Sequence, residues 1–100
     1  MDITANQVYT FKLNSGEEMV TKVLEVADAY YLIEKPVSIA PGQQGMQMIP
    51  SAFTMELEKP VRLNINAVTM VFETNADVVN SYKTATTGVV RPPEKKILTG

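Results

Sequence analysis

The stretch LNSGEEMVTKVLEVADAYYLIEKP constrains the fold more than any other part of this sequence. After an Asn-Ser-Gly turn, Met19 and Val23 lie an even number of residues apart, so they share one face of a strand. The next core residue on that face is Val26, because Glu25 is charged. An odd step in a period-two pattern predicts that a bulge takes up one extra residue at Leu24–Glu25 and bends the strand. We therefore expect these three apolar residues to be buried and Glu25 to be exposed.

Four more segments have the alternating or apolar pattern of strands. They are residues 8–13, 30–39, 51–65 and 67–72. In the segment 51–65 the apolar residues alternate at Phe53, Met55 and Leu57. This segment could also be two strands, with the second beginning after Pro60. Residues 40–50 are rich in Gly and Gln, which predicts a mobile loop.

The sequence period changes after the last of these strands. Apolar side chains recur at helical spacing up to Tyr82. Asn75 or the preceding threonine can cap the N-terminus of such a helix, and Gly88 can stop the chain beyond its C-terminus. The sequence therefore predicts a short helix near residues 75–86.

Five short strands, one of them bent, followed by a helix indicate an all-β protein. We expect a small, strongly bent five-stranded antiparallel barrel with a short C-terminal helix. The alternative is an open five-stranded sheet that the helix covers on one face. The odd step in the second strand favours the barrel, because strands bend where a short sheet closes on itself. One domain is expected over residues 1–90 and a disordered tail over residues 91–100.

Histidine and cysteine are both absent, which excludes much chemistry. Without them there is no Ser-His-Asp triad, no disulfide and no common zinc site. The five glycines are scattered singly, so no Gly-rich loop is available to cradle a phosphate. The carboxylates at Glu17–Glu18 and Glu56–Glu58 have the pattern of solvated surface. We therefore expect no catalytic residues, no metal site and no cofactor, and an enzyme such as a hydrolase or transferase is only a distant alternative.

The formal net charge of −2 is unevenly distributed along the chain. Residues 91–100 hold Arg91, Lys95 and Lys96 against Glu94, so the first ninety residues carry −4. A general phosphate-backbone binder needs a clustered basic face, which an acidic body does not provide. No apolar run reaches the ~18–20 residues of a membrane span, and the N-terminus lacks the pattern of a secretory signal. We expect a cytoplasmic protein without a membrane partner.

The bent strand resembles the first motif of the Sm and Sm-like (LSm) superfamily, to which Hfq-like proteins belong. In that motif a leucine precedes a glycine by three residues, and hydrophobic residues follow the glycine by three, seven and ten. These positions are filled here by Leu13, Gly16, Met19, Val23 and Val26. Thr21 stands where the family has a second glycine, so the small size is kept and the backbone freedom is lost.

The whole chain also resembles the short Sm-like proteins encoded by tailed phages, in which SGEE, EKPVSI and a helix near a tyrosine recur in similar order. The resemblance implies an Sm-like barrel that forms a homo-oligomeric ring, in which the fifth strand of one subunit pairs with the fourth strand of the next. We expect about five to seven subunits. The expected function is a non-enzymatic assembly or scaffold module, located in the host cytoplasm if a phage encodes it, with an unknown protein partner. The edge-strand residues of this interface would be Phe53, Met55, Leu57, Thr69 and Val71.

Sm-like proteins also bind oligonucleotides at the inner rim of the ring, which gives the alternative function. The family's pocket uses an acidic residue, a stacking residue and an asparagine, and those places hold Ala27, Ala29 and Tyr31 here. The resemblance thus keeps the barrel frame and loses the base-reading residues. Tyrosine rings and asparagine amides nearby can still stack on bases or hydrogen-bond to them. The candidate residues for binding single-stranded RNA or DNA are Asp28, Tyr30, Tyr31, Arg62 and Asn64. Packing in the core or at the interface is the alternative role of the two tyrosines.

Overall fold

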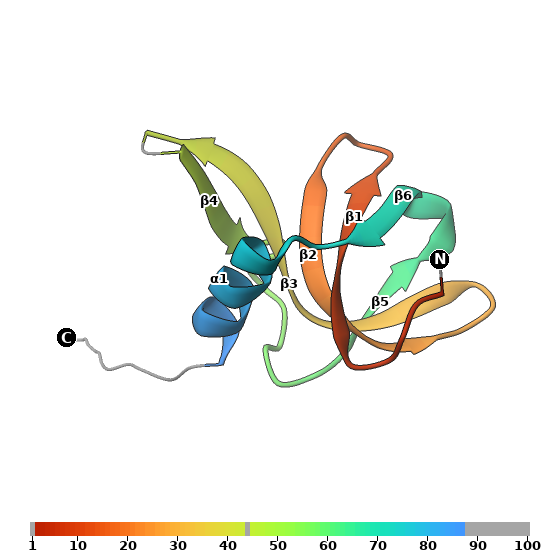
Figure 1. The fold of residues 1–100 in the computed structure, drawn as a ribbon. Coiled ribbons are helices and arrows are strands. Elements are labelled where there is room, and N and C mark those ends of the chain that lie inside the picture. The colour runs from red at the N-terminus through yellow and green to blue at the C-terminus, as the bar shows by residue number, and fades with distance from the viewer. Residues whose placement is uncertain (1, 44, 88–100) are drawn as a thin grey trace.

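A computed structural model describes residues 2–43 and 45–87 as an antiparallel sheet with a short helix against it (Figure 1). The strands are β1 (Gln7–Leu13), β2 (Glu18–Val26), β3 (Tyr30–Gly42), β4 (Gly45–Pro50), β5 (Val61–Asn64) and β6 (Val68–Glu73). A 3-10 turn, η1 (Ile65–Ala67), links β5 to β6, and the helix α1 is Ala76–Thr86. The prediction of a mainly antiparallel β protein with a short C-terminal helix is confirmed. The tail expected at 91–100 lies outside the described residues.

The sheet is open and has six strands where five were expected. Its order is β4-β3-β2-β1-β6, and β5 pairs with β3 beside this path. The thirteen-residue strand β3 pairs with β5 over residues 30–33 and with β4 over residues 37–42. The sheet is neither closed nor strongly curled. It therefore follows the open alternative more closely than the barrel. One end of the sheet is β6, and the other end is shared by β4 and β5, which pair with different parts of β3.

The odd step in β2 is a bulge, as predicted. The pairing of β2 with β3 shifts between Val23 and Glu25, which makes Leu24 the extra residue. Met19 and Val23 are buried and Glu25 is exposed, as expected. The predicted burial of Val26 is wrong, because this side chain is 50% exposed. The pairing of β1 with β2 ends at Val23, so β2 continues past the edge of the core after the bulge.

The strand predicted through Phe53, Met55 and Leu57 does not form. Residues 51–60 are bends and turns, and Phe53 is 86% exposed. The neighbouring strand β3 is already paired with β4 and β5 over ten of its thirteen residues, so it leaves almost no edge for this segment. Alternation alone did not make a strand here, because a strand also needs a partner strand that satisfies its backbone groups.

The fourth strand lies instead in the Gly- and Gln-rich stretch that was predicted to be a loop. Gly42 pairs with Gly45 at the tip of the β3–β4 hairpin, and Gly45 has a φ of 107°. Glycine adopts this conformation without strain, and tight hairpin turns require it. The glycines that suggested mobility therefore close a hairpin.

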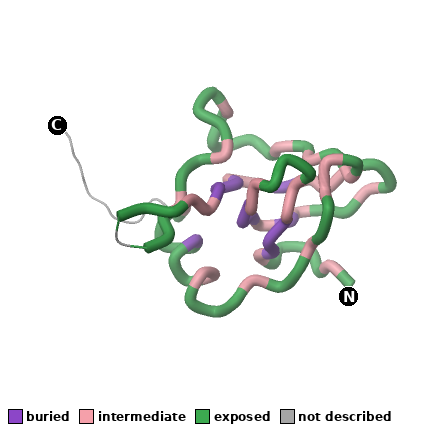
Figure 2. The backbone as a smooth tube through the Cα atoms, turned by 90° about the horizontal axis from the view of Figure 1, so that it is seen from above, coloured by how far each residue is buried: buried purple, intermediate pink, exposed green. Residues whose placement is uncertain are grey.

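Hydrophobic cores lie on both faces of the sheet, and the buried residues gather along its middle (Figure 2). The core on the inner face consists of Tyr9, Phe11, Met19, Val23 and Ile33. The core on the opposite face consists of Val20, Val37 and Tyr82, with Val8, Ile39, Met48 and Val78 packed around it. Successive residues of β1 and β2 serve opposite faces. We call the second face the helix face, because α1 covers it.

The helix begins and ends close to the predicted residues. Asn75 caps its N-terminus, since the Asn75 side chain accepts a hydrogen bond from the Val78 amide at 2.9 Å. Tyr82 is the buried residue of α1 and places the helix against the sheet. Within the described part of the chain, no helix is both long and apolar enough to cross a membrane.

Candidate functional site

The structure brings three of the five candidate nucleic-acid-binding residues together. Tyr30 and Asn64 are paired across β3 and β5, and the Arg62 guanidinium carbon lies 4.4 Å from the centre of the Tyr30 ring. Tyr31 points to the opposite face, where its ring lies 5.0 Å from the ring of Phe11. Tyr31 therefore serves the inner core, which is the alternative role given to it above.

The remaining candidate, Asp28, is exposed in the turn between β2 and β3. The group on β3 and β5 thus offers one half-buried aromatic ring, one exposed guanidinium and one exposed amide: Tyr30, Arg62 and Asn64. An arginine on an aromatic ring is a stacking surface that also binds bases. A single cation neutralises few phosphates, so this site provides little of the charge on which nucleic-acid affinity depends.

Large apolar side chains are exposed on both end strands of the sheet. On β4 they are Met46 at 70% and Ile49 at 38% exposure, and on β6 they are Met70 at 52% and Phe72 at 37%. Within the described chain, β4 is hydrogen-bonded only to β3, and β6 only to β1. The two strands have six residues each, and Glu73 is their one charged residue. Unprotected edges of this kind are surfaces for pairing with another chain.

The residues predicted for the interface lie in three different environments. Phe53, Met55 and Leu57 belong to the segment 51–60 and not to an edge strand. Thr69 lies on the edge strand β6, and its hydroxyl donates to Asn14 Oδ1 at 2.7 Å. Val71 is also on β6, but its side chain packs against the inner core. The sequence thus predicts the edge strand β6. It does not predict the edge strand that contains Met46, because residues 40–50 have the composition of a loop.

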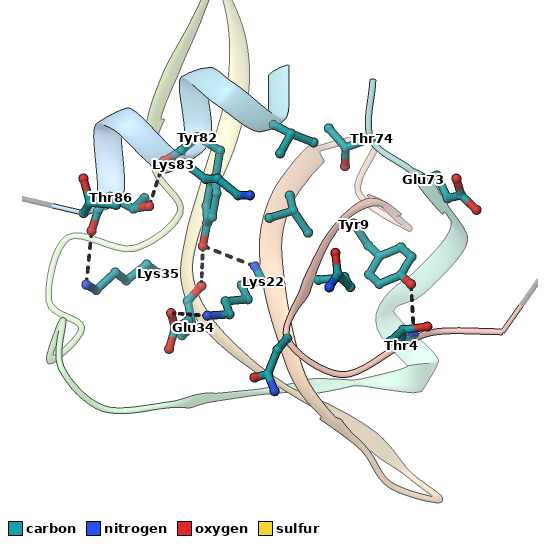
Figure 3. A pocket seen from close by; sticks show the side chains of 15 residues that line it. Thr4, Tyr9, Lys22, Glu34, Lys35, Glu73, Thr74, Tyr82, Lys83 and Thr86 are labelled. Carbon is teal, nitrogen blue, oxygen red and sulfur yellow. Dashed lines mark hydrogen bonds and ion pairs between the residues drawn. The ribbon is translucent and has the colours of Figure 1, made fainter. Parts of the chain in front are cut away.

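A polar cavity of about 740 Å³ lies between α1 and strands β1 to β3 (Figure 3). Tyr82 projects from α1 along its wall, and its hydroxyl donates to the Glu34 carbonyl at 2.8 Å and accepts from the Lys22 amide at 3.2 Å. Burial raises the pKa of the Tyr82 hydroxyl above its ordinary value of 10.0, and the hydrogen bond from Lys22 partly opposes this shift. In the sequence, Tyr82 is only one member of a helical apolar stripe, and that pattern does not predict this role.

The charged side chains around this cavity are largely engaged with the protein itself. Lys35 Nζ donates to the Thr86 carbonyl in the last turn of α1 at 3.1 Å. A cation at this place also interacts favourably with the helix dipole. Lys22 Nζ lies 4.0 Å from Glu34 Oε2. The Lys35 contact holds the helix to the sheet, and the Lys22–Glu34 pair links β2 to β3. The cavity therefore has the character of a helix-docking site.

A second cavity of about 560 Å³ lies on the other side of α1, and we call it the apolar groove. Its apolar lining comes from the sheet and from the helix: Val20, Ile39, Met46, Met48, Phe72, Val78 and Ala85. The lining includes residues of both end strands, β4 and β6. The groove therefore adjoins the unpaired edges of β4 and β6.

No group of three or more metal-ligating side chains occurs in the described residues. Comparison with known proteins gives no match to any family model and no relative among curated proteins. The proposal below therefore depends on the sequence and on the geometry of the end strands.

Proposed function

We propose that this protein is a non-enzymatic assembly module whose copies join head to tail through β4 of one copy and β6 of the next. The observation that carries this proposal is the pair of unpaired, six-residue end strands with exposed apolar side chains and one charge between them. Each strand alone is an aggregation hazard, and mutual pairing removes both hazards together. The protein partner that such an assembly would bind is not specified by these features.

A contact between two different edges is heterologous, so the assembly either closes into a ring or grows into a fibre. We propose a closed ring of about five to seven subunits. The resemblance to Sm-like proteins supports this choice, because in that family the last of the five strands in one subunit pairs with the fourth strand of the next. Here β4 and β6 are the fourth and last strands in the chain.

A charge placed on an edge strand tests this proposal. Met70 on β6 is paired with Lys12 on β1, so Met70→Glu puts opposite charges side by side within one copy and keeps the fold. In the seam between copies, the same carboxylate would also lose water against the apolar side chains of the neighbouring strand. We expect light scattering to show a smaller species for Met70→Glu, whereas Thr84→Glu on the exposed side of α1 keeps the mass of the unmodified protein. An unchanged mass for Met70→Glu would contradict the proposal.

Binding of single-stranded RNA is the second candidate function. The observation in its favour is the Arg62 guanidinium over the half-buried Tyr30 ring, with Asn64 beside it. The acidic body and the single cation favour only weak binding at this place. Titration with a labelled oligonucleotide, described in the Discussion, tests this function independently of the assembly.

A further inference from the structure

We propose that the apolar groove receives Met46 of the neighbouring copy, which packs on Phe72 at the mouth of the groove. This inference rests on the proposed assembly and adds to it the face, the register and the role of α1. The occupant is a second copy of this chain.

The first step is that three of the four exposed apolar residues on β4 and β6 lie on the helix face: Met46, Met70 and Phe72. Met46 and Met48 are two residues apart on β4 and line the apolar groove with α1. On β6, Phe72 lines the same groove and pairs with Thr10 of β1. Met70 is two residues from Phe72 and shares its face. Paired end strands therefore bring apolar side chains together on one face.

The second step is the register of the seam. Antiparallel strands are two- to three-fold more common than parallel ones. An antiparallel pairing of β4 with β6 along their whole six-residue lengths places Met46 opposite Phe72, and Met48 opposite Met70. Directly opposed side chains on one face are in contact. Thioether sulfur atoms also make favourable contacts with aromatic rings.

The third step is that α1 forms one wall of the groove. Val78 and Ala85 line the groove from the helix, and Asn75 lies where β6 leads into α1. Met46 of the neighbour, seated on Phe72, lies at the entrance of this groove. Docking of α1 on its own sheet and binding of the next copy are thus coupled, since undocking of the helix removes a wall of the binding site.

Cysteine cross-linking tests the register, because the unmodified chain contains no cysteine. Cα atoms of directly opposed strand residues lie about 4.5–5.5 Å apart, within the range that a disulfide spans. We expect Met46→Cys/Phe72→Cys to give a ladder of covalent multimers on mild oxidation. Ile49→Cys/Phe72→Cys is the control, because Ile49 lies on the opposite face of β4 from Met48. Oxidation of this control should leave the chains without covalent cross-links. Cross-linking of the control alone, or a disulfide closed within one chain, would overturn the proposed register.

Filling the groove tests the role of the helix. Ser81 is exposed and lines the groove, whereas Thr84 is exposed outside both cavities. We expect Ser81→Trp to raise, by about tenfold or more, the concentration at which the assembly dissociates. Thr84→Trp should leave this concentration unchanged. Circular dichroism checks that both variants fold. Equal assembly of the two variants would refute groove docking while the proposed ring stands. An unmodified protein that is monomeric would refute the ring itself.

Discussion

The hydroxyl of Tyr82 donates a hydrogen bond to the backbone carbonyl of Glu34 at 2.8 Å, and so fixes α1 to β3. The bond is made next to a second irregularity of the sheet, where the pairing of β2 with β3 shifts between Val20 and Lys22. Lys35 lies within this irregularity and has a φ of 48°, a left-handed conformation that is uncommon for lysine. The helix thus docks on the part of the sheet where the ladder is irregular.

Removal of the Tyr82 hydroxyl is expected to destabilise the fold. In Tyr82→Phe the partly buried amide of Lys22 loses its hydrogen-bond partner, while the Glu34 carbonyl keeps the bond from the Thr21 hydroxyl. We expect a loss of about 1–3 kcal/mol in the free energy of unfolding, measured by urea denaturation. Tyr30→Phe is the matched control, because no hydrogen bond of the Tyr30 hydroxyl occurs within the described residues. Equal stability of the two variants would contradict the role given to Tyr82.

The same residue predicts a loss of stability at alkaline pH. Burial raises the pKa of Tyr82 in the folded state above 10.0, so the folded protein holds this proton to higher pH than the unfolded chain does. The free energy of unfolding should therefore be unaffected by this group below about pH 9 and should fall as the pH rises above about 10. Urea denaturation of the unmodified protein and of Tyr82→Phe over this range measures the effect. A fall of the same size in the variant would show that Tyr82 is not its source.

The N-terminal cap of α1 provides a graded test of helix docking. Asn75→Ala removes the bond to the Val78 amide, and we expect a loss of about 1 kcal/mol in the free energy of unfolding. Asn80→Ala, at an exposed position within the helix, is the matched control and should be neutral or slightly stabilising. If assembly is coupled to helix docking, Asn75→Ala should also assemble less tightly than Asn80→Ala.

Binding of single-stranded RNA is expected to be weak and steeply dependent on salt. Fluorescence anisotropy with labelled oligo-U should give a dissociation constant above about 1 µM at physiological salt, because the body is acidic. Arg62→Ala should weaken the residual binding, since it removes the cation that lies over Tyr30. Lys59→Ala removes an equal charge nearby and serves as the control. Tight binding that is lost in Tyr30→Ala would favour nucleic-acid recognition over assembly.

The sequence predicts the parts of the fold that depend on local pattern. The bulge after Val23, the strand that contains Phe72 and the helix capped by Asn75 all follow from spacing and residue type. These features need no knowledge of distant partners. The predicted burial of Val26 failed, because it depends on where β1 ends beside β2.

The features that the sequence does not predict depend on which segments meet in space. The glycines around residues 42–45 are compatible with a loop or with a hairpin, and pairing with β3 decides between them. The alternation through Phe53 has a strand pattern, but this segment pairs with no strand among the described residues. The bonds of Tyr82 to β2 and β3 join residues 48 and 60 positions apart in the chain. Single-sequence patterns contain no information on such contacts.

The mass of the unmodified protein in solution tests the central proposal most directly. Native mass spectrometry, supported by light scattering at micromolar concentration, distinguishes a closed ring from a monomer and from an open fibre. We expect one discrete species of about five to seven subunits of 11.0 kDa, with a mass that does not grow as concentration rises. A single species at 11.0 kDa would contradict the pairing of β4 with β6, and a mass that increases continuously with concentration would contradict ring closure.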